Sequence, residues 1–176
     1  MIISLTGFMG CGKTSVGREL ASRLGWRFVD LDDAVCAMEH RTVAEIFADG
    51  GEDAFRAAES RALKAELHTT ENTVIALGGG TVTRSEAREL VLSRTTSIYL
   101  RARLGSLLEY LEGDTSRPLY DKSTAGVLLR NREEFYLAAD FTVDVDGLAP
   151  AQVCDLLLER EIVGGVVHTS KVDCGT

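Results

Sequence analysis

Residues 7–14 read GFMGCGKT, which matches the phosphate-binding pattern G-x-x-x-x-G-K-[ST]. Glycines in such a loop allow the tight turn that presents backbone N–H groups to a phosphate. Lys13 offers a positive charge to the β- and γ-phosphates of a nucleoside triphosphate, and Thr14 offers a hydroxyl to Mg²⁺. The sequence therefore predicts that ATP binds along this loop, at Gly10, Cys11, Gly12, Lys13, Thr14 and Ser15.

The segments on either side of the loop fit this prediction. Ile2–Thr6 is a short apolar, β-branched run typical of a buried parallel strand. Val16, Leu20 and Leu24 recur at helical spacing, so the loop should open onto a helix N-terminus, whose dipole favours anions. Cys11 is open to two interpretations, a reactive thiol at that N-terminus or a small side chain that fills the loop.

Two carboxylates follow the second predicted strand, Arg27–Asp30, in the run VDLDD. On an extended backbone Asp30 and Asp32 face the same side. Asp30 could hold a water molecule on Mg²⁺, and Asp32 could accept the proton of an attacking hydroxyl. Each aspartate taken alone also fits a solvated cap at the end of a strand.

Glycines and arginines complete the candidate constellation. Gly78–Gly80 follows the strand predicted over 73–77, and guanidinium groups suit a carboxylate or phosphate because they bind it in a bidentate manner. Arg56 also lies at helical spacing from Glu52 and Glu59, so it could simply belong to an intrahelical salt-bridge ladder. The three candidate arginines are Arg56, Arg117 and Arg132.

The elements that position these residues alternate between strand and helix. Five strands with intervening helices predict an α/β fold of three layers, a parallel sheet with helices on both faces. Ligands of such sheets bind at the carboxyl ends of the strands. The other strands are expected at 97–100 and 141–144. One helix is expected from Thr42 to a break at Gly50–Gly51, and the next from that break to residue 68. The remaining helices are expected at 34–39, 85–92, 101–112, 124–138 and 151–160.

Composition limits the function classes. The chain has 176 residues, 45% of them hydrophobic, with a formal net charge of −8, which argues against nucleic acid or an anionic membrane as a partner. Its four cysteines form no C-x-x-C pair, so we expect neither zinc nor disulfides. Because the chain begins with a strand and no secretory signal, we expect it in the cytoplasm. We also expect it to be a monomer. We expect one domain over 1–160 with a mobile lid at about 113–123, followed by a tail over 161–176.

Taken together, these residues and motifs resemble those of the shikimate kinase family. The resemblance runs from Ile2 to about Arg160 and depends on the order and spacing of several motifs, which are GFMGCGKT, FVDLDDAV, TVAEIFADGGEDAFRAAE, VIALGGGTV, TSRPL and NREEFY. It implies a P-loop kinase fold and ATP-dependent phosphorylation of the 3-hydroxyl of shikimate, on the route to chorismate and the aromatic amino acids.

The resemblance also implies a role for each candidate residue. Asp32 becomes the ligand of the substrate hydroxyls and the base, while Lys13 and Arg117 stabilise the transferred charge. Arg117 lies in the lid and reaches the ATP phosphates. Glu59 orients Arg56, and Mg²⁺ is held by Thr14 and, through water, by Asp30. The groups that hold shikimate are Arg56, Arg132 and the backbone of Gly79 and Gly80.

The sequence departs from the family in the residues that would contact the adenine. Family members often present arginines to the base, but the matching stretches here, LLEYLEG and VDVDGLAP, contain none. We therefore expect apolar and backbone contacts to hold the adenine.

The nearest alternative function is another small P-loop kinase, acting on gluconate or a nucleoside monophosphate. A nucleotide switch is a more remote one, because the chain has no N-K-x-D motif.

Overall fold

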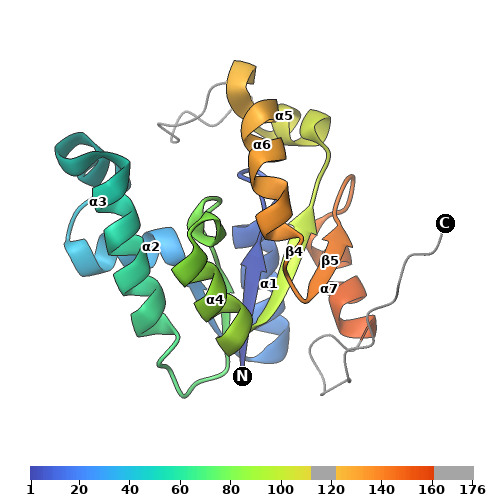
Figure 1. The fold of residues 1–176 in the computed structure, drawn as a ribbon. Coiled ribbons are helices and arrows are strands. Elements are labelled where there is room, and N and C mark those ends of the chain that lie inside the picture. Colours follow the sequence, from blue (N-terminus) through green and yellow to red (C-terminus); the bar gives the residue numbers. More distant parts are fainter. Residues whose placement is uncertain (112–121, 161–176) are drawn as a thin grey trace.

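The computed structural model describes residues 1–111 and 122–160 (Figure 1). Five parallel strands form a single sheet in the order β2-β3-β1-β4-β5, which confirms the predicted α/β architecture. The predicted tail over 161–176 lies outside the described residues, as does most of the predicted lid. The strands are β1 (Ile2–Thr6), β2 (Arg27–Asp30), β3 (Thr73–Ala76), β4 (Thr96–Arg101) and β5 (Phe141–Asp144).

Helices cover both faces of this sheet. Figure 1 shows α4 and α6 in front of the strands, whereas α1 lies behind them and packs against α7. The helices α2 and α3 pack against each other beyond the β2 edge. The helices are α1 (Lys13–Leu24), α2 (Leu31–Glu39), α3 (Val43–Glu66), α4 (Ser85–Arg94), α5 (Leu104–Leu111), α6 (Lys122–Tyr136) and α7 (Pro150–Glu159).

The central strand β1 sets the position of the others. All five of its residues are buried, as expected for a parallel strand covered on both faces. Leu5 pairs with Ala76 of β3 and with Ile98 of β4, and Ala76 also pairs with Asp30 of β2. Because the strands are parallel and in this register, β1, β2 and β3 end at the same edge of the sheet. The segments that follow them therefore start side by side.

The second helix begins earlier than the sequence pattern predicted. The side chain of Asp30 accepts a hydrogen bond of 3.1 Å from the backbone N–H of Asp32, so Asp30 is the N-cap of a helix that starts at Leu31 rather than at Ala34. The expectation of an extended backbone from Asp30 to Asp32 was therefore wrong. Asp32 lies in the first turn of α2, and helical geometry rather than strand alternation decides where it points.

The third helix confirms two expectations. Thr42 and Glu45 form the predicted capping box, in which Glu45 Oε2 accepts from Thr42 N at 2.7 Å and Thr42 Oγ1 accepts from Glu45 N at 3.2 Å. The predicted break at Gly50–Gly51 is present as a kink at which two helical segments meet within α3. Gly51 has φ 66° and ψ −162°, a conformation that is nearly restricted to glycine, and the chain returns to helix directly after it.

We predict that Gly51→Ala lowers the free energy of unfolding by about 1–3 kcal/mol, because alanine at this φ and ψ is strained. A Cβ at Gly51 would meet no atom within 4 Å, so crowding contributes nothing to the effect. The matched control is Gly105→Ala in α5, which is also exposed and open but lies in a regular helix. Gly105→Ala should raise the free energy of unfolding by up to about 1 kcal/mol. Urea denaturation of both variants checks the prediction, and an equal effect of the two would contradict it.

Candidate active site

The loop after β1 is built for close approach of an anion. Gly7, Gly10 and Gly12 have φ of 143°, 81° and 90°. A Cβ on Gly7 would lie 2.7 Å from the carbonyl oxygen of Leu100, so no larger residue fits there. The Gly12 N-cap offers no side-chain acceptor to the first turn of α1. The N–H groups of that turn are therefore available to a phosphate.

Lys13 lies folded over the same loop. Its Nζ donates to the carbonyl oxygens of Gly7 and Phe8, both at 2.9 Å, and only 9% of the residue is exposed. These two carbonyls hold the ammonium group at the centre of the turn. A positive charge in this position attracts any phosphate that enters the loop.

The two predicted carboxylates lie next to the loop, in different roles. Asp30 Oδ2 accepts a hydrogen bond of 2.7 Å from the hydroxyl of Thr14, while its Oδ1 caps α2. Asp30 is therefore held at both oxygens and links β2 to the start of α1. Asp32 follows in the first turn of α2, and its Oδ1 lies close enough to Gly78 that a Cβ there would meet it at 3.1 Å.

Arg56 is anchored by a buried ion pair. Its Nη1 donates to Glu59 Oε2 at 2.8 Å, and the side chains of Arg56 and Glu59 are only 7% and 4% exposed. A weaker contact of 3.3 Å joins Arg56 to Glu52, which is 57% exposed. Desolvation disfavours the Arg56 cation, but the attraction of Glu59 and of Glu52 outweighs it and raises the pKa of Arg56. The predicted salt-bridge ladder thus exists and fixes the guanidinium.

Glu59 also holds the glycine segment. Its Oε1 accepts a hydrogen bond of 2.6 Å from Thr81, the residue after the triple glycine. The guanidinium of Arg56 lies directly against Gly80, where a Cβ would collide with it. Sequence reasoning missed Thr81, although its place next to Gly80 was the available signal. One carboxylate therefore positions both a cation and a backbone turn.

The carbonyl of Gly79 joins this turn to α6. It accepts hydrogen bonds from Arg132 Nη1 at 3.3 Å and from the phenol of Tyr136. Burial raises the pKa of Tyr136 above its ordinary value, so the phenol keeps its proton at neutral pH. The sequence analysis did not single out Tyr136. Its position four residues after Arg132 puts both on one helix face, which was the signal that could have found it.

The loop after β1, the two aspartates and part of the glycine segment line a cavity of about 310 Å³, which we call the phosphate cavity. Arg132 and Arg56 lie beside it, against Gly79 and Gly80, and Arg56 lines a separate groove between α3 and α4. Arg117 lies outside the described residues. The lining residues are Gly10, Gly12, Lys13, Thr14, Ser15, Asp30, Asp32, Leu77, Gly78, Gly79 and Tyr110.

Two kinds of feature are absent from the described residues. In the range 1–111 and 122–160, no cluster of three or more His, Cys, Asp or Glu side chains could bind a metal ion by itself. Nor does that part of the chain hold a helix with the length and apolar character needed to span a membrane.

Comparison with known proteins agrees with this geometry. The model of a family described as shikimate kinase matches residues 9–161. A shikimate kinase from Moorella thermoacetica is 41% identical over 154 residues, which cover 86% of this chain and 88% of the relative.

Solved structures give the same result. A shikimate kinase from Acinetobacter baumannii in complex with shikimate superposes with a TM-score of 0.86 at 31% identity, covering 90% of this chain and 91% of the other. A shikimate kinase from Aquifex aeolicus gives 0.81 at 32% identity, covering 94% and 100%. The similarity therefore extends over most of the chain.

We predict that Glu59→Ala lowers the free energy of unfolding by about 3–5 kcal/mol, because it leaves the buried Arg56 without its main partner. The matched control is Glu52→Ala, which removes the exposed partner of the same arginine and should cost no more than about 1 kcal/mol. Urea denaturation of both variants measures the difference. Equal losses would show that the Arg56–Glu59 pair is not the anchor of this region.

Proposed function

The chain belongs to the shikimate kinase family, and we propose that it transfers the γ-phosphoryl group of ATP to the 3-hydroxyl of shikimate, giving shikimate 3-phosphate and ADP. The observation that carries this proposal is the shared wall of the phosphate cavity. Lys13 and Thr14 of the loop line the same space as Asp32 and Gly79. A phosphate donor and a hydroxylated acceptor could therefore meet in one enclosure.

The phosphates of ATP would bind along Gly10–Ser15. The open N–H groups at the start of α1 and the ammonium of Lys13 would offset the negative charge that spreads over the transferring group. Lys13 would then replace one of its two hydrogen bonds to a neutral carbonyl oxygen by a hydrogen bond to a charged phosphate oxygen. Arg117, predicted from the sequence to act on the same charge, stays a prediction.

Mg²⁺ fits the residues present. The Thr14 hydroxyl and the Asp30 carboxylate are hydrogen-bonded to each other beside the loop, and Mg²⁺ usually takes few protein ligands in addition to phosphate oxygens and water. Thr14 would bind the ion directly and Asp30 through water. When bound, the ion neutralises phosphate charge.

The acceptor would bind on the opposite side of the cavity. Arg132 and Arg56 are the cations at Gly79 and Gly80, and either guanidinium suits the carboxylate of shikimate. The backbone of these two glycines can approach a small ring closely. Asp32 would accept hydrogen bonds from the substrate hydroxyls and take the proton of the attacking 3-hydroxyl as the phosphoryl group transfers in line.

The proposed substrates call for no macromolecular partner. Shikimate and ATP are small and soluble, and neither requires a nucleic-acid or membrane surface. The expectations of a monomer, of a cytoplasmic location, of one domain over 1–160 with a lid near 113–123, and of a separate tail over 161–176 stay predictions.

One assay tests the function directly. ADP release from Mg-ATP should depend on shikimate, with kcat/KM at least about 10²-fold higher than for gluconate or a nucleoside monophosphate, because only shikimate matches the carboxylate and hydroxyl contacts. All acceptors are offered in parallel to the same enzyme. If the enzyme preferred gluconate or a nucleoside monophosphate, the chain would be a kinase for that acceptor and the proposal would be wrong. If no acceptor stimulated ADP release, the proposal would also be overturned.

We predict that Asp32→Asn lowers kcat by about 10²- to 10⁴-fold, because asparagine cannot take the proton of the attacking hydroxyl. The neighbouring Asp33 provides the matched control. Its side chain is 78% exposed and lies 3.9 Å from Arg18 on the outer side of α2, so Asp33→Asn should leave kcat within about 2-fold. Steady-state kinetics with shikimate compare the two. A loss of only a few-fold in Asp32→Asn would remove this residue from the role of base.

A further inference from the structure

The triple glycine continues into η1 (Thr81–Thr83), a single turn of 3₁₀ helix that holds the glycine carbonyls. The carbonyl oxygen of Gly78 accepts a hydrogen bond of 3.1 Å from the N–H of Thr81. That of Gly80 accepts from the N–H of Thr83 at 3.2 Å and from its hydroxyl at 2.7 Å. Because η1 donates to both carbonyls, a shift of η1 would shift the backbone of the glycines with it.

Arg88 holds η1 from the side of α4. Its Nη1 donates to the carbonyl oxygen of Val82 at 2.8 Å and, more weakly, to that of Thr83 at 3.4 Å. The last carbonyls of a helix have no partner within that helix, so a side chain has to supply the donor. The backbone N–H of Arg88 donates to the carbonyl of Arg84 at 3.0 Å, within the first turn of α4. The helix therefore fixes the base of the side chain that binds η1.

The same guanidinium also contacts α6. Its central carbon lies 4.8 Å from the centroid of the Phe135 ring, which is within the range of a cation–π contact. Phe135 lies three residues after Arg132 and directly before Tyr136, whose hydroxyl donates to the carbonyl of Gly79. Figure 1 shows α4 and α6 on the same face of the sheet. One side chain of α4 thus joins the turn after the glycines to the helix that carries Arg132.

Arginine suits this double contact better than lysine does. The N–H groups of a guanidinium point outward in its plane, whereas an aromatic ring contacts its face, so Arg88 makes both contacts at once. Arg88 is half-buried, and partial removal from water strengthens the attraction between a cation and a ring. A lysine has a single ammonium group and could not serve both partners equally well.

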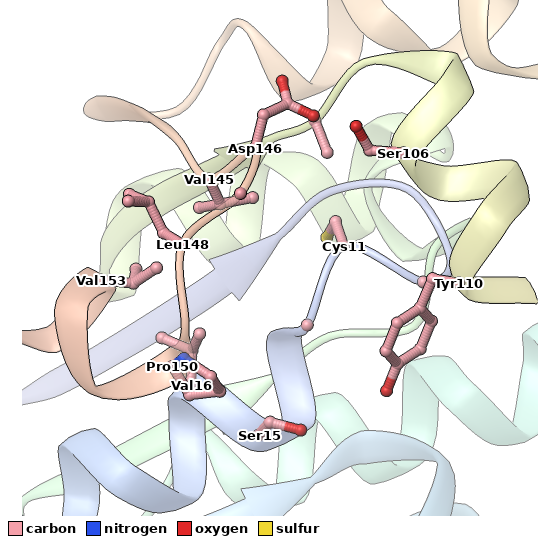
Figure 2. A pocket seen from close by; sticks show the side chains of 14 residues that line it. Cys11, Ser15, Val16, Ser106, Tyr110, Val145, Asp146, Leu148, Pro150 and Val153 are labelled. Atoms are coloured by element: carbon pink, nitrogen blue, oxygen red, sulfur yellow. The ribbon is translucent and has the colours of Figure 1, made fainter.

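Arg88 stands apart from the nucleotide loop. It lines neither the phosphate cavity nor a second cavity of about 220 Å³, which Figure 2 shows between the loop after β1, the helix α5 and the connection from β5 to α7. The side chain reaches the site only through η1 and α6. These elements adjoin or carry the groups proposed to hold the acceptor, so a change at Arg88 should act on the acceptor and not on ATP.

We propose that Arg88 is a positioning residue, which sets the spacing between the backbone of Gly79 and Gly80 and the guanidinium of Arg132, and through it the affinity for the acceptor. This inference rests on the proposed function in that these groups hold the carboxylate of the acceptor. It adds a residue of α4 that binds neither substrate. The two contacts of Arg88 hold the two sides of the acceptor site at a fixed distance from each other.

Steady-state kinetics of Arg88→Ala test the effect on the acceptor. The KM for shikimate should rise about 3- to 30-fold, because the groups that hold its carboxylate lose their fixed spacing. The KM for ATP and kcat should change less than about 2-fold, since the variant removes only binding that is equal in the ground and transition states. The matched control is Arg94→Ala, which removes an exposed arginine at the other end of α4 and should change none of these parameters. An unchanged KM for shikimate would overturn the proposal, as would an equal loss for both substrates.

Two further variants separate positioning from a general loss of structure. Arg88→Lys keeps the charge and should recover part of the affinity for shikimate that Arg88→Ala loses, because an ammonium can still donate to Val82 or contact the ring. Phe135→Leu removes the ring but keeps an apolar side chain. If Arg88 acts through this ring, Arg88→Ala and Phe135→Leu together should raise the KM for shikimate by less than the product of their separate effects. Full additivity, or a lysine variant as weak as the alanine variant, would remove Arg88 from the positioning role.

Hydrogen exchange tests the same contact without any acceptor. The backbone N–H groups of residues 78–83 should exchange faster in Arg88→Ala than in the wild-type protein, whereas Arg94→Ala should leave their exchange unchanged. Equal exchange in Arg88→Ala and the wild-type protein would overturn the proposal. If the wild-type protein does not phosphorylate shikimate, the proposed function fails, and the exchange rates still decide whether Arg88 holds the turn after the glycines.

Discussion

The parallel register of β1, β2 and β3 is the constraint on which the site depends. Leu5 pairs with Ala76, and Ala76 pairs with Asp30, so the three strands end at one level. Each then continues into a different functional segment, namely the glycine loop, the aspartates of α2 and the triple glycine. A shift of one strand by a residue would turn its side chains to the other face and separate these segments. Buried pairing of the strands thus sets distances within the site.

A second constraint is electrostatic, and it lies in the buried pair Arg56–Glu59. Removing two charges from water is costly, and the attraction within the pair together with the hydrogen bond from Thr81 offsets this cost. The arrangement holds a protonated guanidinium against the backbone of Gly80. A carboxylate ligand thereby meets an arginine whose orientation is already fixed, which lowers the entropy lost on binding.

The sequence was most informative where local chemistry decides the structure. The glycine loop, the capping box of Thr42 and Glu45, and the five strands all followed from residue type and spacing. It was misleading where two local patterns competed. Asp30 could end a strand or cap a helix, and it does both, so the aspartates do not alternate as on a strand. Tyr136 and Arg88 escaped sequence reasoning because their partners, Gly79 and Phe135, lie far away along the chain.

The carbonyl of Gly79 has two hydrogen-bond donors, so one of them can leave without disturbing the backbone. It accepts from Tyr136 and, at the longer distance of 3.3 Å, from Arg132, and Gly79 also packs against the loop at Met9. If Arg132 binds the substrate carboxylate as proposed, Tyr136 still satisfies the Gly79 carbonyl, so no buried acceptor is left unpaired. The arginine can therefore move at little cost while the glycine segment keeps its place against the loop. A rigid backbone with one exchangeable donor suits a site that must hold ATP in place while the acceptor enters and leaves.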